Sequence, residues 1–278
     1  MGFCDIVTFS KFPQYEVPLG KRRLVWRSKL SIDLKWGRVV ALGASLPLLL
    51  STAVAAESIS TPLPESRAPC AAFAVDAEYV SQFLVMDLEG GNVPLRIPIQ
   101  FLEDFWDHKQ GFADTAQLFR VEIGTFQPVS RKESGRRNKE GIWNWITFVV
   151  KDVLPLERLA VLSAESWSAV IGGDQARRLE SYAPSPGPFG LAEIRSDAPQ
   201  PTSDFRTNTY IAQSNDGVLA AVLSCNALGS FPYPGCQHWF RAAGMDVELS
   251  YRRTELPNWK ALQEDVTTFL ICATRKHP

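Results

Sequence analysis

Histidine is scarce in this sequence, which limits the chemistry that the protein can perform. The chain has 3 histidines in 278 residues, and His277 lies next to the C-terminus, where disorder is common. His108 and His238 remain as candidates for a general base or a metal ligand. His108 follows Asp107, but adjacent residues on a helix do not face each other, so we expect that pair at a surface helix end.

Familiar catalytic motifs are missing too. After residue 55 the sequence contains no G-x-S-x-G nucleophile elbow, no Gly-rich phosphate loop and no H-E-x-x-H zinc motif. It also lacks an internal repeat, which excludes solenoid and propeller folds. We therefore predict no catalytic residue, no cofactor and no metal, and a binding protein rather than an enzyme.

An apolar segment near the start of the chain predicts export. Lys29, Lys35 and Arg38 precede an apolar run from Val39 to Ala53, and small residues lie before a cleavage point at Ala56. This is the pattern of a secretory signal peptide, so we expect a periplasmic mature protein. The uncharged stretch is 18 residues long, the lower limit for a membrane span, so an inner-membrane anchor stays the alternative.

Acidic residues outnumber basic ones in the predicted mature chain. Residues 1–55 hold eight Lys/Arg and three Asp/Glu, which leaves 21 basic and 27 acidic residues and a net charge of −6. Nucleic-acid binding needs a basic stripe, so we expect no nucleic-acid partner. The one basic cluster, Arg131 to Gly141, mixes five cations with two glutamates. We interpret it as a solvated loop, with an anion site as the alternative.

A Pro/Gly-rich connection divides the mature chain into two halves. It runs from Tyr182 to Phe205 and contains five prolines, which lack amide donors and favour an extended surface loop. We predict an N-terminal extension and signal peptide (1–55), an N-terminal α+β half (56–181), the connection (182–205), and a four-stranded meander plus helix (206–278). The connection fits both a domain linker and a long loop inside one domain.

The N-terminal half is less regular than the C-terminal half. Gln117 to Pro128 alternates between apolar and polar residues, which predicts a half-buried strand. Ile142 to Val150 is rich in aromatic and β-branched residues, which predicts a more buried strand. Pro94 to Trp106 changes from an extended pattern to a helical turn, and the spacing of apolar residues in Leu156 to Gly172 suits a helix.

The C-terminal half has the clearest pattern. Extended runs flank Asn215-Asp216-Gly217 and Ala243-Gly244, where glycine supplies the positive φ of a hairpin turn. The strand around Val247 to Tyr251 alternates cleanly, so one face must be buried. Leu256 to Lys276 has apolar residues at helical spacing. We predict an α+β fold, with an antiparallel β-meander packed against a C-terminal helix and a mixed α/β N-terminal half.

The cysteines are few and become even in number once the leader is removed. Cys70, Cys225, Cys236 and Cys272 then lie in a chain bound for an oxidising compartment. Cys225 ends one predicted strand and Cys236 begins the next, so we predict a disulfide between them. Parity alone suggests a second bridge between Cys70 and Cys272. A metal site from the first pair and His238 would be one ligand short of a closed tetrahedron.

Short motifs give the chain a resemblance to known proteins. These are RIPIQFL (Arg96 to Leu102), FGL (Phe189 to Leu191), LSCNALGSFPYPGCQHWF (Leu223 to Phe240) and LSYRRTELPNWKAL (Leu249 to Leu262). They resemble a group of uncharacterised proteobacterial exported proteins, some of which are similar to immunity proteins encoded beside type VI secretion effectors. The resemblance implies an exported protein that binds and blocks a toxin, and it supplies no catalytic residue.

The favoured function is therefore protein binding in the periplasm, with a toxin or an envelope protein as the partner. The predicted loop between Cys225 and Cys236 carries the aromatic residues that suit the centre of an interface. We predict Phe231, Tyr233 and Trp239 as protein-binding residues, although Trp239 also suits core packing beneath the loop.

Two other functions fit the sequence less well. An exported enzyme that acts on a cell-envelope component would use Glu103, Asp104 and Asp107, because burial can separate the pKa values of paired carboxylates. A solvated helix face explains the same residues. A membrane-anchored structural protein would require that the N-terminal apolar segment is retained, and only then do we expect contact with a membrane.

Overall fold

The structure is a computed structural model that describes residues 69–74, 76–86, 91–103, 105–165, 177–196 and 206–275. The predicted leader lies outside these residues. Within them, no helix has both the length and the apolar character needed to cross a membrane.

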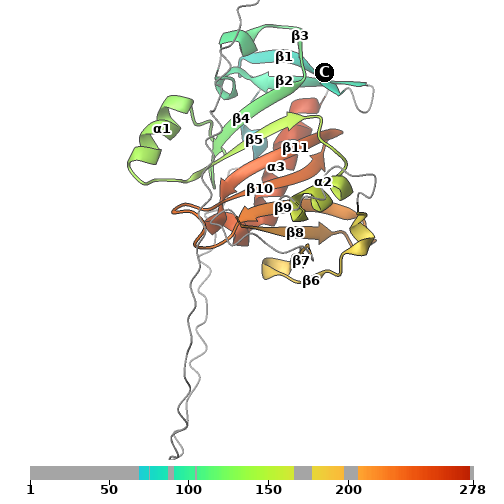
Figure 1. Ribbon diagram of the computed structural model, residues 1–278. Helices are drawn as coiled ribbons and strands as arrows, with labels where there is room; N and C mark the ends of the chain where they lie inside the picture. Colours follow the sequence, from blue (N-terminus) through green and yellow to red (C-terminus); the bar gives the residue numbers. More distant parts are fainter. Residues whose placement is uncertain are drawn as a thin grey trace, which may run out of the picture. The chain divides into compact units, whose positions relative to one another are not determined.

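The main element is an eight-stranded sheet in which every neighbouring pair is antiparallel (Figure 1). In order across the sheet, its strands are β4 (Ala116–Glu122), β5 (Trp145–Lys151), β11 (Met245–Arg252), β10 (Gly235–Ala242), β9 (Leu219–Asn226), β8 (Thr207–Gln213), β7 (Ala192–Ile194) and β6 (Ser185–Pro186). Strands β8 to β11 form the predicted meander. The predicted α+β fold with an antiparallel sheet and a C-terminal helix is confirmed.

Tight turns fix the register of the meander. Ala243 and Gly244 both have positive φ, at 52° and 81°, in the two-residue turn between β10 and β11. Two positive φ values match the right-handed twist of the flanking strands. Gly217, in the turn between β8 and β9, also has φ of 81°. Because successive side chains of a strand point to opposite faces, the register that these turns set decides which alternate residues face the core.

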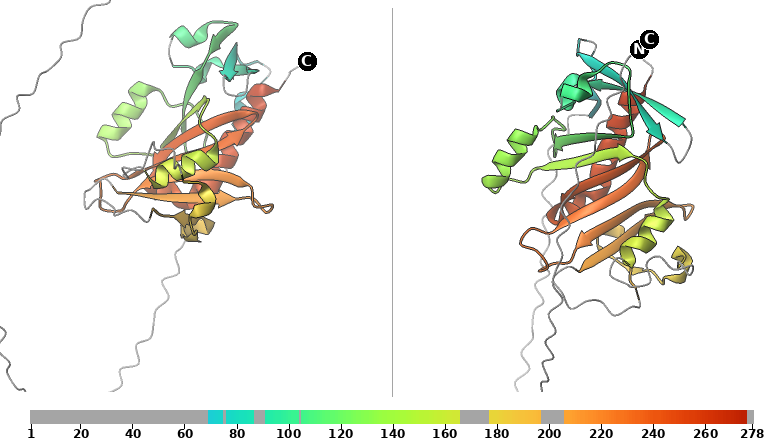
Figure 2. Two further views of the ribbon diagram at one scale, coloured as in Figure 1. Left: turned by 45° about the vertical axis from the view of Figure 1, so that its right-hand side comes forward. Right: turned by 45° about the horizontal axis from the view of Figure 1, so that its top comes forward.

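Helix α3 (Trp259–Thr274) covers one face of the sheet (Figure 2). Its side chains Leu262, Val266 and Phe269 are buried. The ring of Phe269 lies 5.4 Å from that of Phe119 on β4 and 5.9 Å from that of Phe148 on β5, between centroids. These contacts bury the apolar stripe that the sequence predicts for this helix.

A second core lies on the opposite face of the sheet. Helix α2 (Leu156–Ala164) contributes Ala160 and Val161, which pack with Ile211 of β8, Val222 of β9 and Trp239 of β10. The sheet is thus covered by a C-terminal helix on one side and by a helix from the N-terminal half on the other.

A smaller sheet joins the main core. Its order is β2 (Gly91–Pro98), β1 (Tyr79–Met86) and β3 (Phe112–Asp114), with β1 antiparallel to β2 and parallel to β3. The remaining short helices are 3₁₀ segments at Pro69–Ala72, Ile99–Phe101, Phe105–His108, Leu179–Ser181, Pro188–Gly190 and Arg253–Asn258. The first of these holds Cys70, which forms a disulfide with Cys272 of α3.

Two segments differ from the expectation of irregular loop. The basic cluster contains helix α1 (Arg131–Lys139), so the prediction of a loop is wrong, although most of the segment is exposed to solvent as expected. Ser130 caps this helix by accepting a hydrogen bond from the Glu133 amide (3.1 Å). The connection Tyr182 to Phe205 carries β6 and β7, and β7 pairs with β8. The division of the chain at this connection stays a prediction, and the sheet takes strands from both sides of it.

Candidate protein-binding surface

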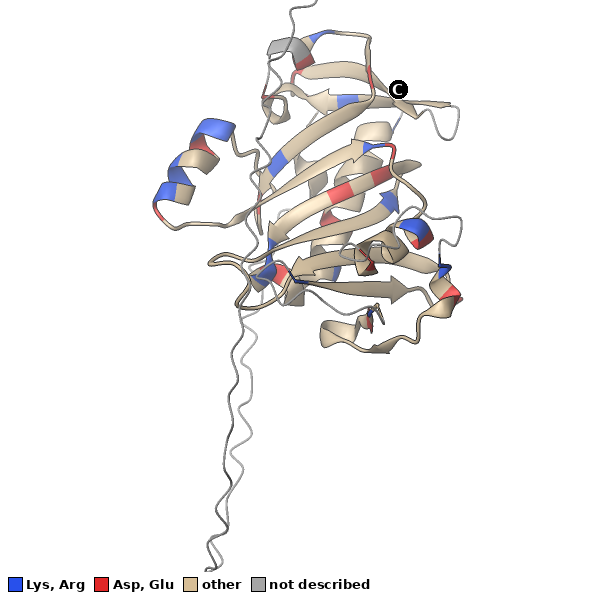
Figure 3. Cartoon of the chain, viewed as in Figure 1, with Lys and Arg blue, Asp and Glu red and all other residues tan. Residues whose placement is uncertain are grey.

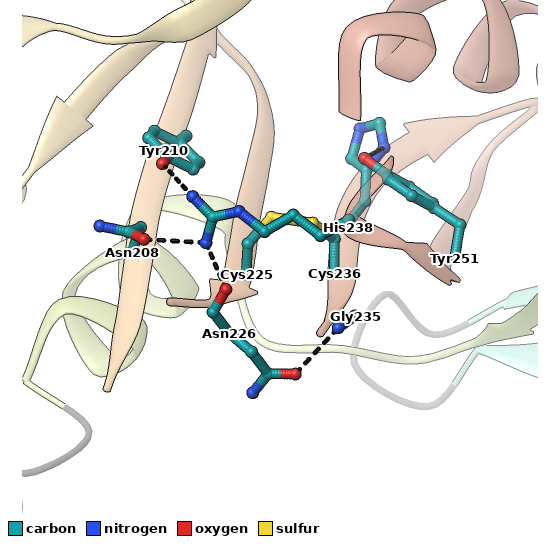
Figure 4. The surroundings of a disulfide bond; sticks show 9 residues. Asn208, Tyr210, Cys225, Asn226, Gly235, Cys236, His238 and Tyr251 are labelled. Carbon is teal, nitrogen blue, oxygen red and sulfur yellow. Dashed lines mark hydrogen bonds between the residues drawn. A yellow bond between two sulfur atoms is a disulfide. The ribbon is translucent and has the colours of Figure 1, made fainter. Parts of the chain in front are cut away.

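The loop between β9 and β10 is closed at its base. Cys225 and Cys236 are directly opposite each other in the register and form a disulfide, with their Cα atoms 4.0 Å apart. One residue further out, the amide of Gly235 donates a hydrogen bond to Oδ1 of Asn226 (3.0 Å), as Figure 4 shows. The ends of loop 227–234 are therefore held together by a covalent bond and a hydrogen bond.

Arg253 ties the same loop to the sheet. Its guanidinium donates to the carbonyl oxygen of Asn226, to Oδ1 of Asn208 (2.8 Å) and to the hydroxyl of Tyr210 (3.0 Å). Its amide donates to the carbonyl oxygen of Pro234 (2.9 Å). Hydrogen bonds to a charged donor are stronger than neutral ones, so this arginine fixes both ends of the loop against β8.

The metal alternative fails on the chemistry of the donor set. Both cysteine sulfurs are used in the disulfide, which leaves no thiolate ligand. His238 is fully buried towards α3, with Nε2 3.0 Å from Oε1 of Gln263. Burial lowers the pKa of His238 to about 3, so the ring stays neutral in the folded protein. In the described part of the chain, no group of three or more His, Cys, Asp or Glu residues could hold a metal ion.

Beside this loop, Tyr233 contacts two side chains from other parts of the chain, and we call the three the aromatic cluster: Trp143, Tyr233 and Arg252. The rings of Trp143 and Tyr233 lie 4.5 Å apart between centroids. The guanidinium of Arg252 lies 4.3 Å from the Trp143 ring and 4.9 Å from the Tyr233 ring. Arg252 also donates to the carbonyl oxygen of Tyr233 (3.1 Å). A tilted contact between the rings and cation–π contacts hold the three in one arrangement.

The structure separates the three aromatic residues predicted for binding. Tyr233 is 58% exposed and Phe231 is 36% exposed, both on the loop. Trp239 is buried under α2 in the second core and does not reach this surface. Trp143 belongs to the surface but was assigned by the sequence pattern to a buried strand. It precedes β5, and the polar Asn144 that follows it is the local signal that this strand begins later.

The carboxylate best placed for the enzyme alternative is engaged by an arginine. Glu103 forms an ion pair with Arg120, and its Oε2 lies 3.7 Å from Nε of Arg131. It lines a hollow of about 530 Å³ together with Glu133. Hydrogen bonds from two arginines of α1 lower the pKa of Glu133 to about 2, so this carboxyl is ionised and a poor proton donor. The arrangement is that of structural ion pairs.

The other residues considered for that alternative lie at the surface or outside the described part of the chain. Asp104 is not among the described residues. The carbonyl oxygen of Asp107 accepts a hydrogen bond from Gln82, and His108 is exposed with Nε2 3.2 Å from the carbonyl oxygen of Leu102. These contacts stabilise a 3₁₀ turn at the surface.

Comparison with known proteins supports the fold. No protein-family model matches the chain, and no curated protein matches it. A similar solved structure is Smlt3025, an immunity protein of the Stenotrophomonas maltophilia type IV secretion system, with a TM-score of 0.51 and 18% identity over 73% of this chain and 100% of that chain. At this identity the similarity shows a common fold.

A second solved structure is less similar. It is the Neisseria meningitidis iron-regulated outer membrane lipoprotein FrpD, with a TM-score of 0.42 and 10% identity over 77% of this chain and 97% of that chain. This similarity is too weak to show a common fold. The two disulfides of the present structure indicate an oxidising compartment, and the chain is similar in fold to Smlt3025.

Proposed function

We propose that the chain is a periplasmic immunity protein, an exported binding protein that neutralises a secreted toxin. The observation that carries this proposal is the aromatic cluster beside loop 227–234. Trp, Tyr and Arg are the residue types most enriched among interface hot spots, and here one of each contacts the other two in a single surface feature. Tyr233, at its centre, is more than half exposed.

Rigidity of the loop supports the same function. Binding to another protein normally costs about 0.5–1.5 kcal/mol for each side chain that becomes ordered. The disulfide, the Asn226–Gly235 hydrogen bond and the contacts of Arg253 order this loop before a partner arrives. A preordered aromatic surface favours slow dissociation, which a protein that must hold a toxin inactive requires.

The fold and the sequence motifs support toxin immunity from different directions. The fold is similar to that of an immunity protein of a type IV secretion system, whereas the motifs resemble exported proteins linked to type VI effectors. On the motifs we propose a toxin of a type VI system. The fold similarity supports immunity without favouring type VI.

The proposal predicts a toxin gene beside this gene, and binding to the product of that gene tests the proposal. We would purify the full chain from the periplasm in oxidised form and measure its Kd for that toxin, together with the survival of cells that produce the toxin. We expect Tyr233→Ala to weaken binding by about 30-fold or more, since a hot-spot residue contributes at least about 2 kcal/mol.

Phe112→Ala is the matched control. Phe112 is an exposed aromatic residue of β3 whose ring also lies near a cation, with Nζ of Lys109 5.7 Å from its centroid. We expect this variant to bind like the wild type. A wild-type chain that neither binds the toxin nor protects the cells would overturn the proposed function, and equal losses in both variants would overturn the assignment of the surface.

A further inference from the structure

Helix α1 is unusual because it does not contribute to the hydrophobic core. It stands beside the edge of the main sheet and not on either face (Figures 1 and 2). All nine of its residues are polar or glycine, and Ser134 is its one buried residue. A helix that is polar all round needs stabilisation from within or a role at the surface.

The stability of α1 comes from its own residues. Ser130 and Glu133 have the spacing of a capping box, and the Ser130 hydroxyl accepts the hydrogen bond from the Glu133 amide. Arg136 forms ion pairs with Glu133 (2.7 Å) and Glu140 (2.6 Å). Packing against the sheet is therefore not what makes this segment helical.

Contacts at its C-terminal end hold α1 rigidly next to the aromatic cluster. Arg137 forms an ion pair with Glu122 of β4 (2.7 Å). Oδ1 of Asn138 accepts a hydrogen bond from the indole Nε1 of Trp143 (2.6 Å). Trp143 thus contacts both the helix and Tyr233, and it joins them into one continuous surface.

The charge of α1 is opposite to that of the rest of the chain. Between Arg131 and Glu140 there are five cations and two glutamates, a net charge of +3, whereas the other residues of 56–278 have 16 cations and 25 acidic residues, a net charge of −9. Figure 3 shows basic residues along this helix. The two glutamates pair with Arg136 and Arg137, and Lys132 and Lys139 form no ion pair with any residue that the structure describes.

We propose that α1 is the electrostatic part of the toxin interface and that it docks onto an acidic surface of the toxin while the aromatic cluster supplies the apolar contact. This inference rests on the proposed function. A cationic helix on an acidic protein selects partners by charge, because the acidic remainder repels them elsewhere. A protein partner suits the site better than lipid or nucleic acid, since glutamates alternate with the cations and an aromatic anchor lies alongside.

Charge reversal on α1 tests this inference. We would compare Lys132→Glu/Lys139→Glu with Lys109→Glu/Lys260→Glu, which changes the net charge equally at exposed lysines elsewhere. Rim charges act mainly on the association rate, so we expect the α1 variant to associate with the toxin about 10-fold or more slowly at low salt, with a flatter salt dependence. We expect the control variant to associate within about 2-fold of wild type.

Each outcome separates this inference from the proposed function. Failure of the wild type to bind the toxin overturns the proposed function and this inference with it. Binding that depends on Tyr233, with equal association rates for the two charge variants, overturns this inference alone. Vesicles of phosphatidylglycerol and a duplex DNA serve as further probes: charge-dependent binding of α1 to either, with toxin association unchanged, would overturn the inference in favour of that ligand.

Discussion

The two disulfides lead to opposite predictions for stability and for binding. Cys225–Cys236 joins residues 11 apart in sequence, and Cys70–Cys272 joins residues 202 apart. The first closes the loop of the proposed interface. The second ties the first described segment of the chain to α3, and none of the contacts of the aromatic cluster involves either of its cysteines.

The magnitudes follow from the length of chain that each bridge constrains in the unfolded state. The chain-entropy relation gives about 3 kcal/mol for the short bridge and about 5 kcal/mol for the long one. Double Cys→Ala variants remove the same atoms in both cases, so the packing losses largely cancel. We expect the variant without Cys70–Cys272 to be less stable than the variant without Cys225–Cys236 by about 2–3 kcal/mol.

Binding should show the reverse order. Without Cys225–Cys236 the loop becomes ordered only when it binds the toxin. The free-energy cost of ordering one or two side chains would weaken toxin binding by about 10-fold. Without Cys70–Cys272 we expect no change in Kd. Peptide mapping without reductant would first establish the pairing. Urea unfolding, with the m-value measured for each variant, then gives the stabilities, and titration with the toxin gives the affinities. A larger stability loss from the short bridge, or equal losses of affinity, would refute this reasoning.

Two further predictions concern buried polar groups. The pKa of His238 is about 3 in the folded chain and has an ordinary value of 6.5, so the unfolded chain binds a proton that the folded chain does not. The contribution of His238 to the free energy of unfolding is therefore complete above about pH 6.5, and it falls by about 1.4 kcal/mol per pH unit as the pH decreases towards 3. His238→Gln, measured by urea unfolding between about pH 5 and pH 7, should flatten this slope, and an unchanged slope would contradict the burial argument. Arg253→Met removes the guanidinium that donates to the carbonyl oxygen of Asn226 and to Oδ1 of Asn208. We expect the free energy of unfolding to fall by about 2–3 kcal/mol and proteolysis within loop 227–234 to become faster. Equal stability and equal protease resistance would show that Arg253 does not hold the loop.

The meander and the C-terminal helix were predictable because their signals are local. Alternation in β11 marks its buried face, Gly217 and Gly244 mark turns that need positive φ, and the apolar stripe of α3 is regular. Each signal agrees with the others, so the same arrangement is favoured at every level.

Helix α1 was missed because sequence periodicity reveals a helix by its apolar stripe, and this helix has none. The capping box of Ser130 and Glu133 was the available signal. The aromatic cluster was missed for a different reason. Trp143 and Tyr233 are 90 residues apart in sequence, and they meet because β5 pairs with β11 and β11 pairs with β10. Such a contact depends on strand order, which one sequence does not reveal.

The position of Trp239 depends on its neighbour. His238 and Trp239 are consecutive in β10 and must face opposite sides of the sheet. His238 faces α3, so Trp239 faces α2, a helix from the N-terminal half. The sequence could indicate that the two side chains lie on opposite faces of the sheet. It could not indicate that Trp239 is buried, because its burial depends on the packing of α2 against that face.

The same alternation explains why one short motif contributes twice to the proposed interface. Arg252 ends β11 and Arg253 follows it, so their side chains leave the backbone in opposite directions. Arg253 reaches beneath the loop to Asn208, Tyr210 and the carbonyl oxygen of Asn226. Arg252 lies against the rings of Trp143 and Tyr233. Arg253 therefore fixes the shape of the loop while Arg252 builds its exposed surface, and a shift of β11 by one residue would turn each side chain to the opposite side and remove both effects.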